Sequence, residues 1–122
     1  MLKFKFLLWM LEKLLRRAIR KHGDAAAHVA GRDVSFQIRT RGGIGRCYRV
    51  HNGGITSKAG IAPNADFTLL FNDASAGFRI LSAKDSQDAF LQGLHDGELV
   101  VSGDFVKVAW FQRLTDFLQP AK

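Results

Sequence analysis

The side chains that most often do chemistry in proteins are few and scattered in this sequence. Four histidines, His22, His28, His51 and His95, lie far apart, and none belongs to an H-E-x-x-H pattern. Cys47 is the sole cysteine, so it cannot form an internal disulfide, and no nearby His gives it the spacing of metal ligands. The sequence therefore predicts no metal site and no cofactor. It also favours a reducing compartment, the cytoplasm.

The acidic residues form no recognisable catalytic set. Most aspartates stand where strand edges, helix caps and turns use Asp for local hydrogen bonds, namely Asp66, Asp73, Asp85, Asp88, Asp96 and Asp104. No Ser-His-Asp or Cys-His arrangement can be recognised along the chain. We therefore expect no catalytic residues and a protein that is not an enzyme.

Charge is distributed unevenly between the two halves of the chain. Residues 1–60 carry a net charge of +10 and residues 61–122 a net charge of −3. This asymmetry predicts an anionic partner for the N-terminal half: lipid headgroups, nucleic acid or an acidic protein. Gly42, Gly43 and Gly45 stand among arginines, but they form no phosphate-binding motif and no recognition motif accompanies them. We therefore expect no nucleic acid as a partner.

Residues 1–22 have the pattern of a basic amphipathic helix that ends before Gly23. The apolar stripe at helical spacing consists of Phe4, Leu7, Leu8, Leu11, Leu14, Leu15, Ala18 and Ile19. Opposite this stripe fall Glu12, Lys13, Arg16, Arg17, Arg20 and Lys21. Phe6, Trp9 and Met10 point into the sector that becomes basic one turn later.

This helix has two interpretations. A basic helix with Trp, Phe and Leu is typical of a segment that lies at a membrane surface, here through Lys3, Phe6, Trp9, Met10 and Lys13. It would place the protein peripherally at the inner face of a membrane. Alternatively, the extra apolar residues pack in the core or against a second subunit in a homodimer. The apolar run Phe6–Leu11 is too short to span a bilayer.

The middle of the chain alternates with period two, as in half-buried strands. Strands are predicted over residues 32–40, 46–51, 55–59 and 65–71, joined by turns at Gly42-Gly43 and Asn52-Gly53. Residues 24–30 are expected to be a connector. From Asp73 onward the pattern predicts two helices, a short strand over residues 98–102 and a last helix that begins after Asp104 and ends at Pro120.

The C-terminal half resembles the type-2 sterol carrier protein family. The family pattern is a strand of the form A-D-hydrophobic-T-hydrophobic, a helix, then A-F-x-x-G-x-hydrophobic-x-hydrophobic-x-G-D and a closing helix. This chain has A-D-F-T-L over residues 65–69, Ala89-Phe90, and then Gly97, Leu99, Val101, Gly103 and Asp104. It departs from the pattern in spacing, because the four residues 94–97 separate Gly93 from Glu98.

The resemblance implies an α+β fold, with a five-stranded, mostly antiparallel sheet covered by helices on one face. It further implies one lipid-binding domain over residues 1–122, with an apolar tunnel for a sterol, fatty acyl chain, phospholipid or isoprenoid. The residues expected to line that tunnel are Phe36, Leu69, Phe71, Phe78, Leu81, Phe90, Leu91, Trp110, Phe111, Leu114 and Phe117. A packed core would use the same residues. The expected function is non-enzymatic lipid binding and transfer; the alternative is an accessory protein of lipid or quinone metabolism that docks on a partner without carrying lipid.

Overall fold

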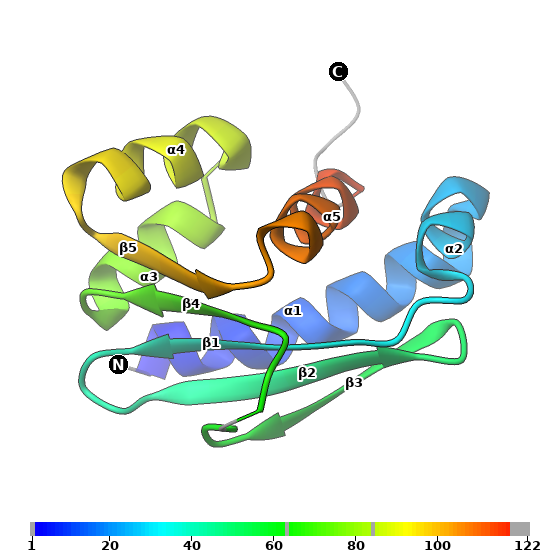
Figure 1. Ribbon diagram of the computed structural model, residues 1–122, viewed down its shortest axis with the longest axis horizontal. Helices are drawn as coiled ribbons and strands as arrows, with labels where there is room; N and C mark the ends of the chain where they lie inside the picture. Colours follow the sequence, from blue (N-terminus) through cyan, green and yellow to red (C-terminus); the bar gives the residue numbers. More distant parts are fainter. Residues whose placement is uncertain (1, 63, 84, 118–122) are drawn as a thin grey trace.

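The computed structural model describes residues 2–62, 64–83 and 85–117 (Figure 1). Its elements, in chain order, are α1 (Leu2–Lys21), α2 (Gly23–Val29), β1 (Val34–Thr40), β2 (Gly45–His51), β3 (Gly54–Ala59), β4 (Phe67–Phe71), α3 (Ala74–Leu81), α4 (Ser86–Asp96), β5 (Leu99–Gly103) and α5 (Phe105–Asp116). The predicted helix end at Pro120 lies outside the described residues.

The five strands form one sheet in the order β3-β2-β1-β4-β5. β1 and β4 run parallel, and the three other neighbouring pairs are antiparallel. Because β4 lies beside β1 and not beside β3, the segment after β3 crosses the outer face of the sheet. The amide of Gln37 on β1 bonds both the carbonyl and the N–H of Ala62 in that segment. The predicted five-stranded, mostly antiparallel sheet is confirmed.

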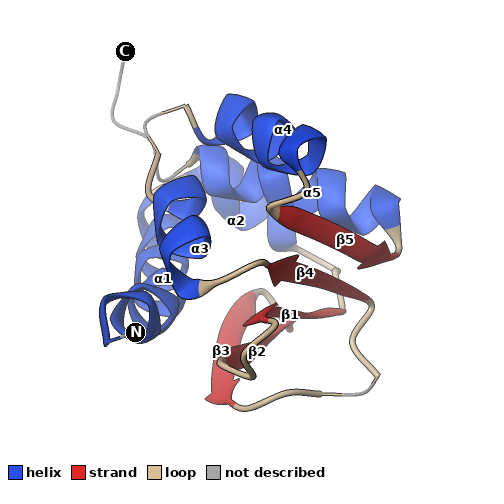
Figure 2. Cartoon of the chain, turned by 90° about the vertical axis from the view of Figure 1, so that its left-hand side faces the viewer, coloured by secondary structure: helices blue, strands red, loops and turns tan. Residues whose placement is uncertain are grey.

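The helices lie on the other face of the sheet, and the core fills the space between the two layers (Figures 1 and 2). Alternate strand residues point into this space, as the period-two pattern predicted. The ring of Phe36 stacks between those of Tyr48 and Phe67, with 5.0 Å between centroids on each side. From the helices, Phe4 and Phe111 reach the same layer, where they contact Phe71 and Phe36.

The G-D pair that ends β5 has a clear physical role. Gly103 has a φ of +104°, and a Cβ at this position would lie 2.4 Å from the carbonyl oxygen of Asp66. Only glycine therefore permits this approach. The Asp104 N–H then donates to the same carbonyl, while the Asp104 carboxylate accepts from Val106 and Lys107 as the N-cap of α5. Asp73 and Asp85 cap α3 and α4 in the same way.

One sequence-based expectation about local structure is wrong. Residues 24–30 are not a connector, because Gly23–Val29 form α2, which buries Ala25 and Val29. Short helices of this kind depend on tertiary packing more than on their own pattern.

Candidate functional site

Most of the residues expected to line a lipid tunnel lie together between the sheet and the helices. The buried members are Phe36, Leu69, Phe71, Phe90, Trp110, Phe111 and Leu114, with Leu81 and Phe117 partly buried beside them. Phe78 and Leu91 are on the outside, and Leu91 is 62% exposed. The structure thus gathers nine of the eleven residues in one apolar layer.

Trp110 connects this layer to α2. Its indole N–H donates to the carbonyl of His28 at 3.0 Å, and the His28 ring stacks on the indole at 5.4 Å between centroids. His28 Nε2 lies 2.9 Å from the Trp110 carbonyl oxygen, so the two residues bond reciprocally. The polar end of the indole is therefore satisfied inside the protein. Nothing in the sequence around His28 indicated this role.

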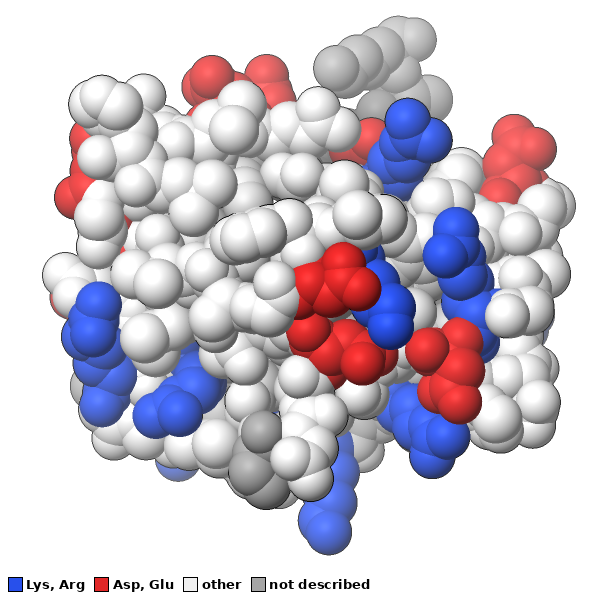
Figure 3. Space-filling view, in the orientation of Figure 1, with Lys and Arg blue, Asp and Glu red and all other residues white. Residues whose placement is uncertain are grey.

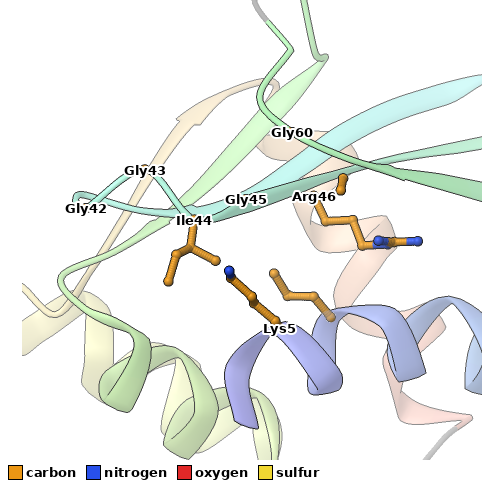
Figure 4. A pocket seen from close by; sticks show the side chains of 9 residues that line it. Lys5, Gly42, Gly43, Ile44, Gly45, Arg46 and Gly60 are labelled. Carbon is orange, nitrogen blue, oxygen red and sulfur yellow. The ribbon is translucent and has the colours of Figure 1, made fainter. Parts of the chain in front are cut away.

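Two open pockets flank the N-terminal half of α1. The first, which we call the α1–hairpin pocket, has a volume of about 510 Å³ and is lined by Lys5, Leu8, Gly42, Gly43, Ile44, Gly45, Arg46, Ala59 and Gly60 (Figure 4). The second, of about 520 Å³, lies between the first turns of α1 and α3 and includes Lys3, Phe4 and Phe78. Neither is lined by Trp110 or Phe111, where the tunnel was expected, so the tunnel stays a prediction.

The N-terminal half of α1 leaves large apolar side chains uncovered. Phe6 is 58% exposed and Trp9 is 43% exposed, and their rings lie 5.8 Å apart. The Lys13 ammonium group sits over the Trp9 ring at 5.2 Å, while Lys3 is exposed and Met10 is partly buried. Among the described residues, no helix has the length and apolar character needed to cross a bilayer. These side chains therefore form a surface feature of α1.

Glu12 contradicts the expectation that it lies on the outer side of this helix. It is only 3% exposed, and its carboxylate accepts from Ser57 on β3 and pairs with Lys13 and Arg16. Burial acts to raise its pKa, but the hydrogen bonds and the two cations outweigh burial and hold the pKa below the ordinary value of 4.5. Periodicity alone could not find this, because the hydrogen-bond donor Ser57 comes from β3, far from Glu12 along the chain.

A second polar contact holds α1 on the sheet close to Glu12. The Tyr48 hydroxyl on β2 donates to the carbonyl of Leu8 at 2.6 Å. Burial raises the pKa of Tyr48, so this hydroxyl stays protonated and remains a donor. On the same face of β2, Arg46 donates through Nε to Ser57 at 2.8 Å. α1 is thus fixed by a polar network as well as by its apolar stripe.

A further exposed apolar area lies on the opposite part of the surface. Figure 3 shows a broad uncharged region over β5 and the start of α5. Here Val100, Phe105 and Val106 are exposed, and the charged residues stand toward the edges of the region. Acidic residues outnumber basic ones in this half of the chain. The surfaces at α1 and at α5 therefore differ in charge although both expose apolar side chains.

No protein-family model matches the sequence, and no curated protein is significantly similar to it. Solved structures do match. One, UbiJ-SCP2, described as a ubiquinone synthesis protein, has a TM-score of 0.69 and 20% identity over 93% of this chain and 96% of its own. A sterol carrier protein 2 has a TM-score of 0.60 and 18% identity over 91% and 95% of the two chains.

A third match lies inside a larger enzyme. The inverting sec-alkylsulfatase Pisa1 from Pseudomonas sp. matches with a TM-score of 0.57 and 16% identity over 80% of this chain but only 14% of its own. The architecture therefore occurs both as a small separate chain and as a minor part of a long one. Together with the sheet order and the Gly103-Asp104 junction described above, these likenesses show that this chain has the sterol carrier protein 2 fold.

Proposed function

We propose that residues 1–122 form one non-enzymatic lipid-binding domain, which holds an apolar ligand between the sheet and the layer of α4 and α5. The observation that carries this proposal is the fold, which matches sterol carrier protein 2 over nine-tenths of both chains. The buried layer of Phe36, Phe67, Trp110 and Phe111 supports it, since this space contains large rings and few polar groups.

A ligand in this space would replace contacts between rings. Burial of an apolar side chain stabilises by about 25 cal/mol per Å² whether its neighbour is protein or lipid, so the exchange need not cost much. α4 is the element most suited to move, because it contributes Phe90 to the core while Leu91 and Leu94 on its surface are exposed. In the proposal, α4 shifts outward and Leu91 turns toward the ligand.

Membrane contact is the second part of the proposal. Phe6 and Trp9 protrude beside Lys3 and Lys13, which is the composition of a segment that lies in the headgroup region of a bilayer. Lysines near such a surface are attracted to anionic lipids by about 1 kcal/mol each. The N-terminal half of α1 would thus bring the domain to the bilayer from which it takes a ligand. The competing possibility, a homodimer through the same side chains, predicts a concentration-dependent mass in solution.

Native mass spectrometry of the freshly purified protein tests the lipid-binding function. We expect a second species, heavier by the mass of a lipid, that disappears when the protein is unfolded, with the lipid recovered in an organic extract. The matched control is the same preparation after delipidation, which should regain the heavier species when incubated with vesicles. A single mass equal to that of the chain in both preparations contradicts the proposal.

A second function has its own observation. UbiJ-SCP2 is described as a ubiquinone synthesis protein, and the exposed Phe105 and Val106 offer an apolar surface on which a partner protein could dock. Under this function the domain is an accessory protein of lipid or quinone metabolism and carries no lipid. Lipid-free protein in the experiment above would favour it.

A further inference from the structure

We propose that the α1–hairpin pocket binds the phosphate group of an anionic phospholipid while Phe6 and Trp9 enter the acyl region beside it. This inference rests on the proposed membrane contact of α1 and adds a defined headgroup site to it. It concerns a different place from the apolar layer under α4 and α5.

The walls of the pocket come from segments far apart in sequence. α1 contributes Lys5 and Leu8, the β1–β2 turn contributes Ile44, and the ends of β2 and β3 contribute Arg46 and Ala59 (Figure 4). The remaining wall consists of the backbone of Gly42, Gly43, Gly45 and Gly60, and a Cβ at Gly43 or Gly60 would meet no other atom within 4 Å. A volume of about 510 Å³ accommodates a phosphodiester headgroup with room for water.

The charges of the pocket suit an anion. Lys5 and Arg46 are its two charged lining residues among those described, and both are cationic. Nε of Arg46 is engaged by Ser57, but no described hydrogen bond or ion pair uses its terminal amino groups or the Lys5 ammonium group. Arginine and lysine are the side chains that most often bind phosphate, through charge-assisted hydrogen bonds.

The nearest acidic group does not cancel this charge. Glu12 accepts from Ser57 and pairs with Lys13 and Arg16, so its carboxylate is already compensated by two cations of α1. It is also buried beneath the helix. The charges of Lys5 and Arg46 are therefore not compensated by Glu12 and remain for an anion in the pocket.

The pocket lies beside the exposed aromatic pair. Trp9 follows Lys5 by one helical turn, and Leu8, which lines the pocket, is adjacent to Trp9 in sequence. The Phe6 ring lies beside that of Trp9, tilted by 36°, and Ile44 adds an apolar wall on the hairpin side. A phosphate between Lys5 and Arg46 would therefore leave its acyl chains near Trp9 and Phe6, so that both contacts could be made with one bilayer.

The test compares two substitutions on β3. Each places a glutamate opposite an arginine of β2, one on the inner face of the sheet and one on the outer face. Ala59 on β3 is paired with Arg46, and Thr56 is paired with Arg49 on the outer face. The carboxylate introduced by Ala59→Glu should form an ion pair with Arg46 inside the pocket, whereas Thr56→Glu adds an equal charge outside the pocket. Both positions are exposed, so we expect similar melting temperatures.

The readout is binding to phosphatidylcholine vesicles that contain phosphatidylglycerol. We expect Ala59→Glu to weaken binding about tenfold more than Thr56→Glu, the loss of one charge-assisted contact. Lys5→Gln should likewise weaken binding more than Lys3→Gln, which removes the same charge outside the pocket. Equal losses within each pair would mean that only the overall charge matters and would overturn the headgroup site.

Two further arms separate the possible outcomes. Titration with inorganic phosphate, followed by amide chemical shifts of Gly43 and Gly60, should give weaker binding than the vesicles do. Saturation by phosphate alone, with no further gain from vesicles, would assign the pocket to a free phosphate and overturn the lipid assignment. If Trp9→Glu also leaves vesicle binding unchanged, the proposed membrane contact fails; if Trp9→Glu weakens binding and the pocket pairs do not differ, only the headgroup site fails.

Discussion

The two tryptophans of this protein lie in opposite environments although both belong to helices that cover the same sheet. Trp110 on α5 is 5% exposed, with its N–H bonded to His28 and its ring against α2. Trp9 on α1 is nearly half exposed, with its ring beside that of Phe6 and under the ammonium group of Lys13, both on its own helix. The same residue type thus stabilises the fold in one helix and remains available for an external contact in the other.

The difference has a structural origin in what each helix faces. α5 packs against the sheet and beside α2, where the Trp110 indole stacks on the His28 ring and donates its N–H to the His28 carbonyl. The first half of α1 is covered by the sheet on one side, where Phe4 and Leu8 are buried, whereas Phe6 and Trp9 are exposed. Phe6 and Trp9 thus leave apolar area in contact with water beside lysines, and this is the area that the proposed membrane contact would cover.

The largest expected effect on stability is that of Trp110→Ala. The substitution removes a buried indole and leaves the His28 carbonyl without its donor, so the free energy of unfolding should fall by about 3–5 kcal/mol. Trp9→Ala is the matched change and should alter the free energy of unfolding by less than about 0.5 kcal/mol. Chemical denaturation measures this free energy for both variants, and an equal loss in the two would contradict the difference between the two tryptophans.

Glu12→Gln should have the next largest effect, because it removes a buried charge that accepts from Ser57 on β3 and pairs with Arg16 of its own helix. We expect a loss of roughly 1.5–3 kcal/mol, against about 0–1 kcal/mol for Glu98→Gln, whose exposed pair is with Arg79.

The pKa of Glu12 gives this prediction a pH dependence. Since its pKa is lower in the folded protein, its contribution is present above the unfolded value of about 4.5 and is lost as the pH falls through the folded value. The difference between wild type and Glu12→Gln should therefore narrow below pH 4.5. A constant difference across acidic pH would mean that the carboxylate charge is not involved.

Tyr48→Phe tests the neighbouring polar contact with a smaller change. It keeps the ring that stacks on Phe36 and removes only the hydroxyl that donates to the Leu8 carbonyl. The expected cost is about 0.5–1.5 kcal/mol in the free energy of unfolding. The rate of amide hydrogen exchange in α1 should rise in the same variant. Faster exchange confined to β2 would argue that the hydroxyl does not anchor the helix.

The smallest effect on folding, and the largest on the proposed function, is expected for Trp9→Glu. The melting temperature should stay nearly unchanged, while binding to anionic vesicles and transfer of lipid between vesicles should fall strongly. The binding of the unchanged protein to these vesicles should also weaken as the salt concentration rises. Val106→Glu adds the same charge at a 78% exposed apolar site far from α1 and should leave vesicle binding unaffected. A lower melting temperature for Trp9→Glu would identify Trp9 as a structural residue.

Local patterns in the sequence were sufficient for much of the fold. Alternation placed β1, β2 and β4 within two residues of their observed bounds, and Asp73, Asp85 and Asp104 were identifiable as caps because capping depends on neighbours three residues away. The A-D and G-D motifs were recognisable as family-like, but the close approach of Gly103 to Asp66 was not predicted from them. Periodicity failed for α2, whose seven residues are helical because α1 covers them.

The sequence by itself determined which residues are apolar, which segments alternate and where the charge lies, because these are properties of the chain and its near neighbours. Only the tertiary structure decided that Glu12 is buried, that Trp110 is enclosed while Trp9 is not, and that Lys5 and Arg46 face one pocket. Each of these depends on a partner from another element, brought close by the parallel pairing of β1 with β4 or by the position of α1 across β2 and β3. Helical and strand periods fix a side chain's direction relative to its own backbone, whereas burial and electrostatic environment depend on what the fold places in that direction.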